Sequence, residues 1–183
     1  MNSIIEIKNK KGSKIKVVLK KLDLSYMDKI MKLQQEVVEG LENKEVYYSS
    51  TRKEFEKIIK ELGEIIGYVT LEDELISLGV YCKFGFDKEN YGYDIGLKGN
   101  ELLKVGHIES TIVKEEYRGN NLQKAMCLKL EEIGKNKGSK IMMATASPYN
   151  PYSVNTFKNL GYKIVKDKIK YSGLRRYVFM KNI

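Results

Sequence analysis

The feature that most constrains the fold is a strand, helix and strand in succession between residues 106 and 146. GHIESTIV at 106–113 and KIMMATA at 140–146 have the composition of strands. Between them, residues 121–136 carry apolar side chains at spacings of three and four, which is one face of an α-helix. A connection of this length joins two parallel strands through a right-handed crossover. The chain is therefore predicted to contain a parallel pair in an α/β sheet.

The turn that opens this helix is suited to binding an anion. EEYRGNNLQKAM, residues 115–126, places Arg118, Gly119, Asn120 and Asn121 directly before the helical pattern. The first N–H groups of a helix have no partner within it, and the positive end of the helix dipole lies there, so backbone groups alone can bind a phosphate. Taken by itself, such a turn is more often a solvated loop.

The remaining elements follow from the same patterns. Asp23 or Ser25 precedes a helix that runs toward Gly40, and Thr51 with Glu54 forms a capping box before a second helix. Residues 85–104 have no clear period and read as a long connection. The further predicted strands are 14–22, 64–71, 74–84, 162–171 and 175–183, and the further helices are 51–62 and 151–160.

Charge and composition narrow the possible partners. The net charge is +9, but almost all of the positive charge is lysine spread among acidic residues along the chain. Base and phosphate recognition draws heavily on arginine, and this chain has only four: Arg52, Arg118, Arg175 and Arg176. A dispersed charge of this kind indicates solvation, so no specific nucleic-acid partner is expected.

Metal and membrane binding are not expected either. His107 is the only histidine, and Cys82 and Cys127 lie far apart, so no metal-ligand spacing is available. No apolar run approaches the roughly 20 residues that span a bilayer. With 183 residues and 42% hydrophobic content, the chain is expected to be a single domain, 1–183, in the cytoplasm, as a monomer or homodimer.

The order of the elements and two motifs resemble the GNAT superfamily of N-acetyltransferases. The likeness covers roughly 14–183 in element order and 106–162 at the level of motifs. It implies an α/β fold with a central mixed, mostly antiparallel sheet. This sheet would have a splayed parallel strand pair and be flanked by about four helices.

The first motif of the family is Arg or Gln, two residues, Gly, one residue, then Gly or Ala. Here it begins at Arg118, with Asn121 at the first small position and Gln123 at the second. Asn tolerates positive φ better than other non-glycine residues, so Asn121 is expected to keep the turn. Gln123 would either crowd the cofactor or bond to it.

The second motif is similar to NPYSVNTFKNLGY, residues 150–162. In the family an Asn opens a helix, a small residue follows three later, and an aromatic residue precedes Gly-Phe or Gly-Tyr. The matching positions are Asn150, Ser153, Phe157, Gly161 and Tyr162. Two motifs in the right order at long separation are a stronger signal than either alone.

The resemblance implies acetyl-CoA or another acyl-CoA as cofactor. The backbone of Gly119 to Lys124 would bind the pyrophosphate, and that of Thr111 to Val113 would pair with the pantetheine arm. The residues expected at the cofactor are Thr111, Ile112, Val113, Arg118, Gly119, Asn120, Asn121, Leu122, Gln123, Lys124, Asn150, Ser153 and Phe157.

The implied reaction is direct acetyl transfer, in a ternary complex, to a primary amine of a small molecule or peptide. Alternation along the strand puts Glu109 and His107 on one face, with Glu109 the first candidate for general base and His107 the second. Either residue has a structural alternative, as an ion-pair partner or a hydrogen-bonded core histidine. Phe157 stands where many relatives have a Tyr that protonates the leaving thiolate, and Tyr149 or Tyr152 would substitute.

The acceptor is expected to bind between the first two helices, at 41–50, and at the final hairpin, 167–177. The candidate contacts are Tyr47, Tyr48, Tyr171 and Arg175. An alternative function is an acyl-CoA-binding sensor or interaction module with little catalysis. Phe157 and the altered glycine positions motivate that alternative.

Overall fold

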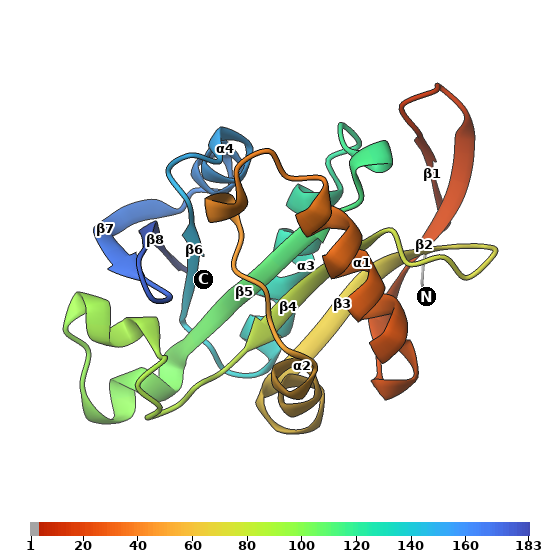
Figure 1. Ribbon diagram of the computed structural model, residues 1–183. Coiled ribbons are helices and arrows are strands. Elements are labelled where there is room, and N and C mark those ends of the chain that lie inside the picture. Colours follow the sequence, from red (N-terminus) through yellow and green to blue (C-terminus); the bar gives the residue numbers. More distant parts are fainter. Residues whose placement is uncertain (1–3) are drawn as a thin grey trace. The chain divides into compact units, whose positions relative to one another are not determined.

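The computed structural model describes residues 4–183 (Figure 1). Its strands form one mixed sheet in the order β1-β2-β3-β4-β5-β6-β8-β7. The chain divides into two compact units. The first unit comprises Met1–Glu42, described from residue 4 onward, with Ser49–Val80 and Ser110–Cys127, and the second comprises Asn43–Tyr48, Tyr81–Glu109 and Leu128–Ile183. The expected mixed sheet is confirmed.

The strands of the first unit are antiparallel. β1 (Ile4–Lys8) pairs with β2 (Lys14–Leu22), and β2 pairs with β3 (Gly63–Thr70). β4 (Ser77–Cys82) begins in this unit. β2 and β3 were predicted with nearly these bounds, whereas β1 was not predicted. Its five residues depend on a partner strand, because short strands gain little stability by themselves.

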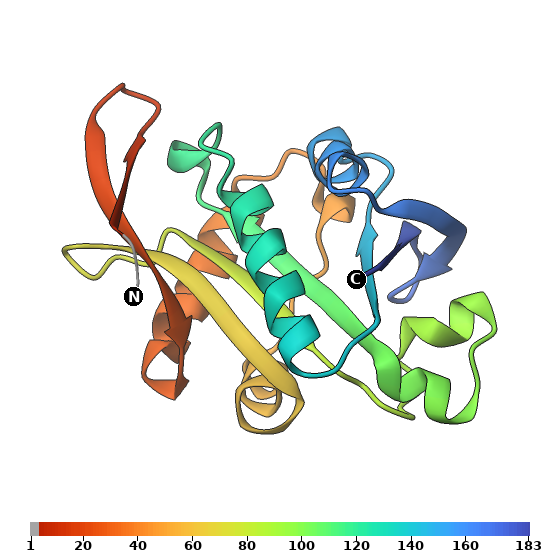
Figure 2. The same cartoon turned by 180° about the vertical axis from the view of Figure 1, so that it is seen from behind.

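Side-chain caps open a 3-10 turn and a helix of the first unit. Asp23 accepts a hydrogen bond from the backbone N–H of Ser25, which opens a 3-10 turn that leads into α1 (Met27–Glu39). Thr51 and Glu54 form the predicted capping box at the start of α2 (Arg52–Lys57). The apolar stripe of α1 is buried, and both views place this helix on one face of β2 and β3 (Figures 1 and 2).

The second unit contains the predicted parallel pair. β5 (Val105–Val113) pairs in parallel with β6 (Ile141–Ala146), and the connection between them carries α3 (Leu122–Asn136). The pairing runs from Val105–Ile141 to Ile108–Ala144 and stops there, although both strands continue. The predicted strand-helix-strand unit is therefore confirmed.

The end of the chain completes the second unit. Asn150 caps α4 (Pro151–Asn159) by accepting from the N–H of Ser153 at 3.1 Å, with Pro151 at the first helical position, as predicted. β7 (Lys163–Lys170) and β8 (Leu174–Asn182) form the expected hairpin, and β8 pairs antiparallel with β6.

The predicted long connection, 85–104, is ordered by side-chain hydrogen bonds. It forms two 3-10 helices, Tyr91–Ile95 and Gly99–Lys104. The Asn90 amide donates to the carbonyl oxygens of Gly85 and Leu102 at 2.6 and 3.1 Å, and its oxygen accepts from the N–H of Gly92. These bonds hold Tyr91 in the core of the second unit, where its side chain is 1% exposed.

Candidate active site

The turn before α3 has the backbone conformation that an anion-binding turn requires. Gly119 has φ of 89° and Asn121 has φ of 56°. The expectation that Asn121 keeps the turn in a left-handed conformation is therefore confirmed. The first hydrogen bond within the helix runs from the Ala125 N–H to the Asn121 carbonyl. The N–H groups of the helical residues before Ala125 therefore have no acceptor within the helix.

Asn120 ties this turn to β1 within the first unit. Its side-chain oxygen accepts from the N–H of Lys8 at 3.0 Å, and its amide donates to the Lys8 carbonyl at 2.7 Å and the Tyr117 carbonyl at 3.0 Å. The strand that sequence patterns missed thus fixes the conformation of the turn. The Asn120 side chain is engaged in this anchoring.

Gln123 lies against the end of β5. Its amide donates to the hydroxyl of Thr111 at 3.0 Å, so a side chain at the family's second small position contacts one of the residues expected at the pantetheine arm. Ile112 is buried, whereas Lys124 and Arg118 are exposed. The Arg118 guanidinium donates to the Val113 carbonyl at 3.4 Å. Backbone N–H groups and two exposed cations are thus present at one helix end, which suits a pyrophosphate.

A hollow of about 440 Å³ in the first unit includes Arg118 in its lining. Two of its lysines are paired, Lys10 with Glu115 and Lys114 with both Glu36 and Glu74. Because Lys10 and Lys114 already have carboxylate partners, these two lysines offer little attraction for an anion. Lys11 and Glu116 also line the hollow.

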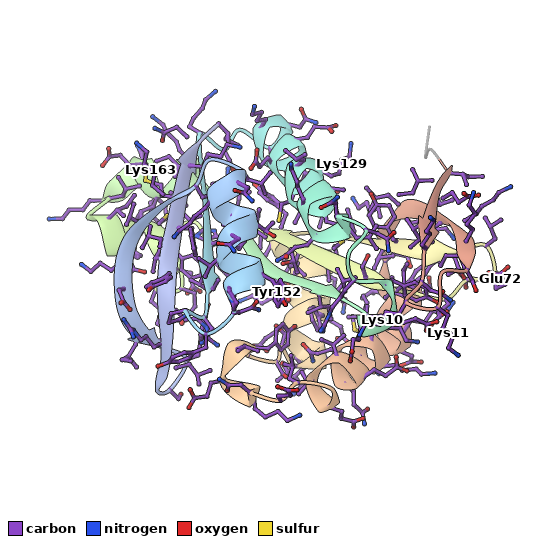
Figure 3. The ribbon with its side chains drawn as sticks, turned by 90° about the horizontal axis from the view of Figure 1, so that it is seen from above. Lys10, Lys11, Glu72, Lys129, Tyr152 and Lys163 are labelled. Carbon is purple, nitrogen blue, oxygen red and sulfur yellow. The ribbon has the colours of Figure 1, made fainter. Side chains whose placement is uncertain are left out.

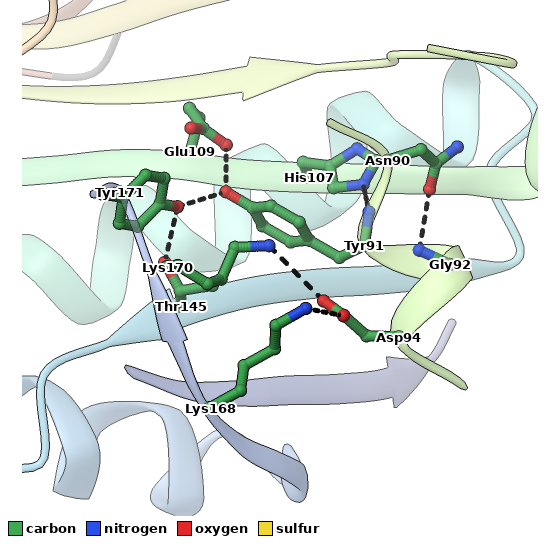
Figure 4. A network of polar contacts seen from close by, with 10 residues as sticks. All are labelled: Asn90, Tyr91, Gly92, Asp94, His107, Glu109, Thr145, Lys168, Lys170 and Tyr171. Atoms are coloured by element: carbon green, nitrogen blue, oxygen red, sulfur yellow. Dashed lines mark hydrogen bonds and ion pairs between the residues drawn. The ribbon is translucent and has the colours of Figure 1, made fainter. Parts of the chain in front are cut away.

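The second unit contains a chain of hydroxyl groups that ends at a carboxylate (Figure 4). The phenol of Tyr91 donates to Glu109 Oε2 at 2.7 Å. The Tyr171 phenol lies 2.7 Å from that of Tyr91, and the Thr145 hydroxyl lies 3.1 Å from that of Tyr171. Since the single proton of Tyr91 is given to Glu109, Tyr171 must be the donor to Tyr91. The hydrogen bonds therefore all point toward Glu109.

Both phenols keep their protons at neutral pH. Burial, followed by the negative charge of Glu109, raises the pKa of Tyr91 well above its ordinary value. The same two causes, in the same order, raise the pKa of Tyr171. Glu109 is half-buried, so its carboxylate is partly accessible to solvent.

His107 has a different role from the one that alternation along β5 suggested. Its Nε2 accepts from the backbone N–H of Tyr91 at 3.2 Å, which leaves the proton on Nδ1, 3.3 Å from the Cys82 carbonyl. Burial lowers the pKa of His107 to about 3. Neither ring nitrogen is available to an amine in this arrangement, so Glu109 is the one remaining candidate for the base.

Charged residues of the same unit hold Tyr91 from the other side. Lys170 Nζ lies 4.1 Å from the centroid of the Tyr91 ring, a cation–π distance. Asp94 pairs with Lys170 at 3.4 Å and also with Lys168 (Figure 4). These contacts fix the ring whose hydroxyl orients Glu109.

Phe157 and the two tyrosines considered as general acid differ in solvent exposure. Phe157 is 2% exposed and packs on Tyr162 and Phe179, with ring centroids 5.3 and 5.2 Å away. Tyr149 is 53% exposed, and Tyr152 is 84% exposed and projects from the start of α4 (Figure 3). Tyr149 interacts with the Arg175 guanidinium, which only donates hydrogen bonds and therefore does not direct the proton of this tyrosine.

The residues considered for acceptor binding fall into two groups. The Tyr48 ring stacks on that of Tyr171, with centroids 4.8 Å apart, and Tyr47 is half-buried in the same segment. Arg175 instead makes a two-point ion pair with Asp167 at the surface, at 3.0 and 2.6 Å. Its neighbour Arg176 is the buried arginine.

Sequence reasoning missed four residues of this site: Tyr91, Thr145, Lys170 and Arg176. Tyr91 lies in a segment without periodicity, and Thr145 in a strand that reads as uniform core. The only available signal was the alternation along the final strands, which places one of two adjacent arginines inside. Without the register of β8, that alternation does not determine which of the two arginines is buried.

The described residues, 4–183, contain no cluster of three or more His, Cys, Asp or Glu side chains that could hold a metal ion. Within the same range, no helix is both long and apolar enough to cross a membrane.

Comparison with known proteins identifies the family. The model of the acetyltransferase (GNAT) family matches residues 26–162. This chain therefore belongs to the GNAT acetyltransferase family. None of the curated protein sequences matches it.

Solved structures share the fold at low sequence identity. A GNAT-family acetyltransferase from Listeria monocytogenes is 16% identical, with a TM-score of 0.66, over 98% of this chain and 100% of that one. A putative acetyltransferase from Salmonella typhimurium, solved with its cofactor acetyl-CoA, is 10% identical, with a TM-score of 0.65, over 91% and 93%. The ribosomal-protein-S18-alanine N-acetyltransferase of Escherichia coli is 10% identical, with a TM-score of 0.67, over 91% and 94%.

Proposed function

We propose that this chain is an acetyl-CoA-dependent N-acetyltransferase, which passes the acetyl group directly to a primary amine of a small molecule or peptide. The observation that carries the proposal is Asn121 at φ of 56°, at a position where the family has a small residue, immediately before α3. The departure in sequence leaves the phosphate-binding turn intact. The Salmonella relative solved with acetyl-CoA supports the choice of cofactor.

The residues of the first unit fit the cofactor. Nothing lies within 4 Å of the place where a side chain of Gly119 would begin, so a phosphate can approach the backbone there. The N–H groups from Gly119 to Lys124 would bind the pyrophosphate, and Lys124 and Arg118 add positive charge. The backbone of Thr111 to Val113 would pair with the pantetheine arm. When bound, acetyl-CoA supplies the acetyl group as a reactive thioester.

Glu109 is proposed as the general base. An amine with a pKa near 10.4 must lose a proton before it can attack, which costs about 4 to 5 kcal/mol at pH 7. Glu109 accepts this proton, directly or through one water molecule. The hydrogen bond from Tyr91 to Oε2 fixes the orientation of the carboxylate.

The release of the thiol places a smaller demand on the protein. An ordinary thiol has a pKa of about 8.5, so its thiolate is a moderate leaving group and a missing acid slows the reaction only in part. Phe157 has no proton to give. Exposed Tyr152, or solvent, protonates the thiolate in this proposal. Neither Cys82 nor Cys127 forms a disulfide, and both are buried, which supports a reducing cytoplasm as the place of the reaction.

The test is release of free CoA thiol from acetyl-CoA across polyamines, amino acids, aminoglycosides and short peptides, with calorimetric titration of acetyl-CoA. Glu109→Gln is expected to lower kcat about 100-fold and to change the acetyl-CoA Kd less than threefold. Glu89→Gln, which removes an exposed carboxylate of the same unit, is the matched control. Absence of acetyl-CoA binding by the unaltered protein would contradict the proposal.

The second candidate is an acyl-CoA-binding sensor with little catalysis. Buried Phe157 and the exposed positions of Tyr149 and Tyr152 favour it, since they leave no oriented acid. A sensor would bind acetyl-CoA tightly in the calorimeter and release no thiol with any acceptor. Glu109→Gln would then have no turnover to lose.

A further inference from the structure

Arg176 is a buried cation without a carboxylate partner. The residue is only 3% exposed. Among residues 4–183, no Asp or Glu forms an ion pair with its guanidinium. Nη1 donates to the carbonyl of Arg175 at 2.9 Å, and Nη2 has no hydrogen-bond partner. Buried charges are nearly always paired and hydrogen-bonded, because removal from water costs several kcal/mol per ion. This guanidinium is therefore missing an anionic partner.

The surroundings of Arg176 compensate its charge only weakly. Burial lowers the pKa of Arg176, and electrostatic interactions with Tyr171, Glu45 and Tyr91 oppose that shift. The guanidinium carbon lies 5.7 Å from the Tyr171 ring centroid, which is a cation–π distance. An aromatic face is a much weaker partner than a carboxylate bound to both guanidinium nitrogens.

Arg176 belongs to the same cluster as the proposed base. The Tyr171 ring packs against Arg176, and its hydroxyl bonds to Tyr91, whose own hydroxyl bonds to Glu109. Tyr171 responds to both charges, since Glu109 raises its pKa and Arg176 lowers it. A cation and an anion thus belong to one cluster around Tyr171 and Tyr91. That is the charge pattern complementary to a molecule with an amine and an acid group.

Tyr48 covers this cluster. Its ring stacks on Tyr171 at an interplanar angle of 15° while remaining 49% exposed, and it comes from the short segment Asn43–Tyr48, which also carries Glu45. A stack on one exposed ring is a contact that side-chain rotation can open. Displacement of Tyr48 would uncover the Tyr171 ring, against which Arg176 packs.

We propose that Arg176 receives the carboxylate of the acceptor, so that the substrates are small amines that also bear a carboxylate. This inference rests on the proposed acetyltransferase function, with Glu109 taking the proton from the amine. One guanidinium with one free nitrogen matches a single negative charge better than a phosphate dianion.

The test uses unbranched amino acids with a terminal amine, from glycine to 6-aminohexanoate. Each acid is compared with its own primary amide, which has the same length but no negative charge. Thiol release is measured with the unaltered protein and with Arg176→Gln, Arg176→Lys and Arg52→Gln. Arg52, on α2, is an exposed arginine that pairs with Asp28. Its variant is therefore the control for loss of a guanidinium. Thermal unfolding of each variant is recorded alongside.

The unaltered protein is expected to prefer the best acid over its amide by about 30-fold or more in kcat/KM, mainly through KM. Arg176→Gln should reduce that ratio below threefold, Arg176→Lys should keep part of the preference, and Arg52→Gln should keep all of it. Arg176→Gln should not lower the unfolding temperature, because it removes an unpaired buried charge. An equal rate for acids and amides, or a preference that persists in Arg176→Gln, would overturn the inference.

Calorimetric titration with 4-aminobutanoate and 4-aminobutanamide separates this inference from the proposed function. Acetyl-CoA binding and thiol release with uncharged amines, without any effect of the carboxylate, would keep the function and reject the role of Arg176. If acetyl-CoA does not bind, the proposed acetyltransferase function is rejected. Titration with the two ligands then still tests whether Arg176 binds a carboxylate. Binding of the acid that Arg176→Gln abolishes supports the site, and equal or absent binding of both ligands rejects it.

Discussion

Tyr91 donates a hydrogen bond to Glu109 Oε2 at 2.7 Å, and thereby joins an irregular connection to strand β5. The same tyrosine accepts from Tyr171 and lies under Lys170. Three segments far apart in the sequence thus determine the orientation of one carboxylate. In the proposed reaction that carboxylate takes the proton from the acceptor amine.

Tyr91→Phe is expected to lower kcat about tenfold and to leave the Kd for acetyl-CoA unchanged. A hydrogen bond to a charged group contributes about 1.5 to 3 kcal/mol, so its loss leaves Glu109 less well oriented. Steady-state kinetics and calorimetry measure the two quantities. Tyr93→Phe is the control, because that phenol is exposed and donates to the Phe86 carbonyl. Equal kcat for the two variants would show that the Tyr91 hydroxyl has no part in the reaction.

The buried His107 is expected to make the protein less stable in acid. Its pKa is about 3 when folded and 6.5 when exposed, so the unfolded chain binds the proton more readily. The resulting stability is present above pH 6.5 and is lost as the pH falls toward 3. From pH 7 to pH 5 the loss from this group is about 2 kcal/mol.

His107→Gln should flatten this dependence, since Gln does not titrate and its oxygen can still accept from the Tyr91 N–H. Urea unfolding at pH 7 and pH 5 gives the free energy of unfolding of both proteins. If the variant loses as much stability in acid as the unaltered protein, another group is responsible.

The left-handed conformation of Asn121 predicts a contrast between two substitutions. Asn121→Gly should keep acetyl-CoA affinity within about threefold, because glycine adopts positive φ freely. Asn121→Val should weaken binding about 5- to 30-fold, since the left-handed region costs other residues about 1 to 2 kcal/mol. Calorimetric titration compares them. Equal affinities would mean that this backbone conformation is not needed for the cofactor.

The Gln123 side chain bonds to Thr111, which predicts a small effect of its removal. Gln123→Ala restores a residue typical of the family and should change the acetyl-CoA Kd by less than threefold. Leu128→Ala, an exposed position of α3, serves as the control for helix substitution. A loss of affinity of tenfold or more would show that Gln123 binds the cofactor directly.

Local patterns predicted most elements, because their signals depend on near neighbours in the sequence. The capping box at Thr51, the N-cap at Asn150 and the parallel pair around α3 were all found this way. β1 escaped detection because five residues are stabilised mainly by pairing with β2 and by the bonds between Asn120 and Lys8. The structure of residues 85–104 was not predicted, because hydrogen bonds of the Asn90 side chain stabilise it rather than a periodic backbone pattern.

By itself, the sequence determined the order of the elements, the turn before α3 and Glu109 as a candidate base. Only the tertiary structure decided which side chains meet. Pairing of Arg176 with Lys168 across β7 and β8 places Arg176 inside and Arg175 outside, and a shift of one residue would exchange them. Likewise, the contact of Tyr91 with Glu109 depends on a connection without periodicity. Side-chain spacing along a strand is local, whereas register and long-range packing are set by contacts that a linear pattern does not contain.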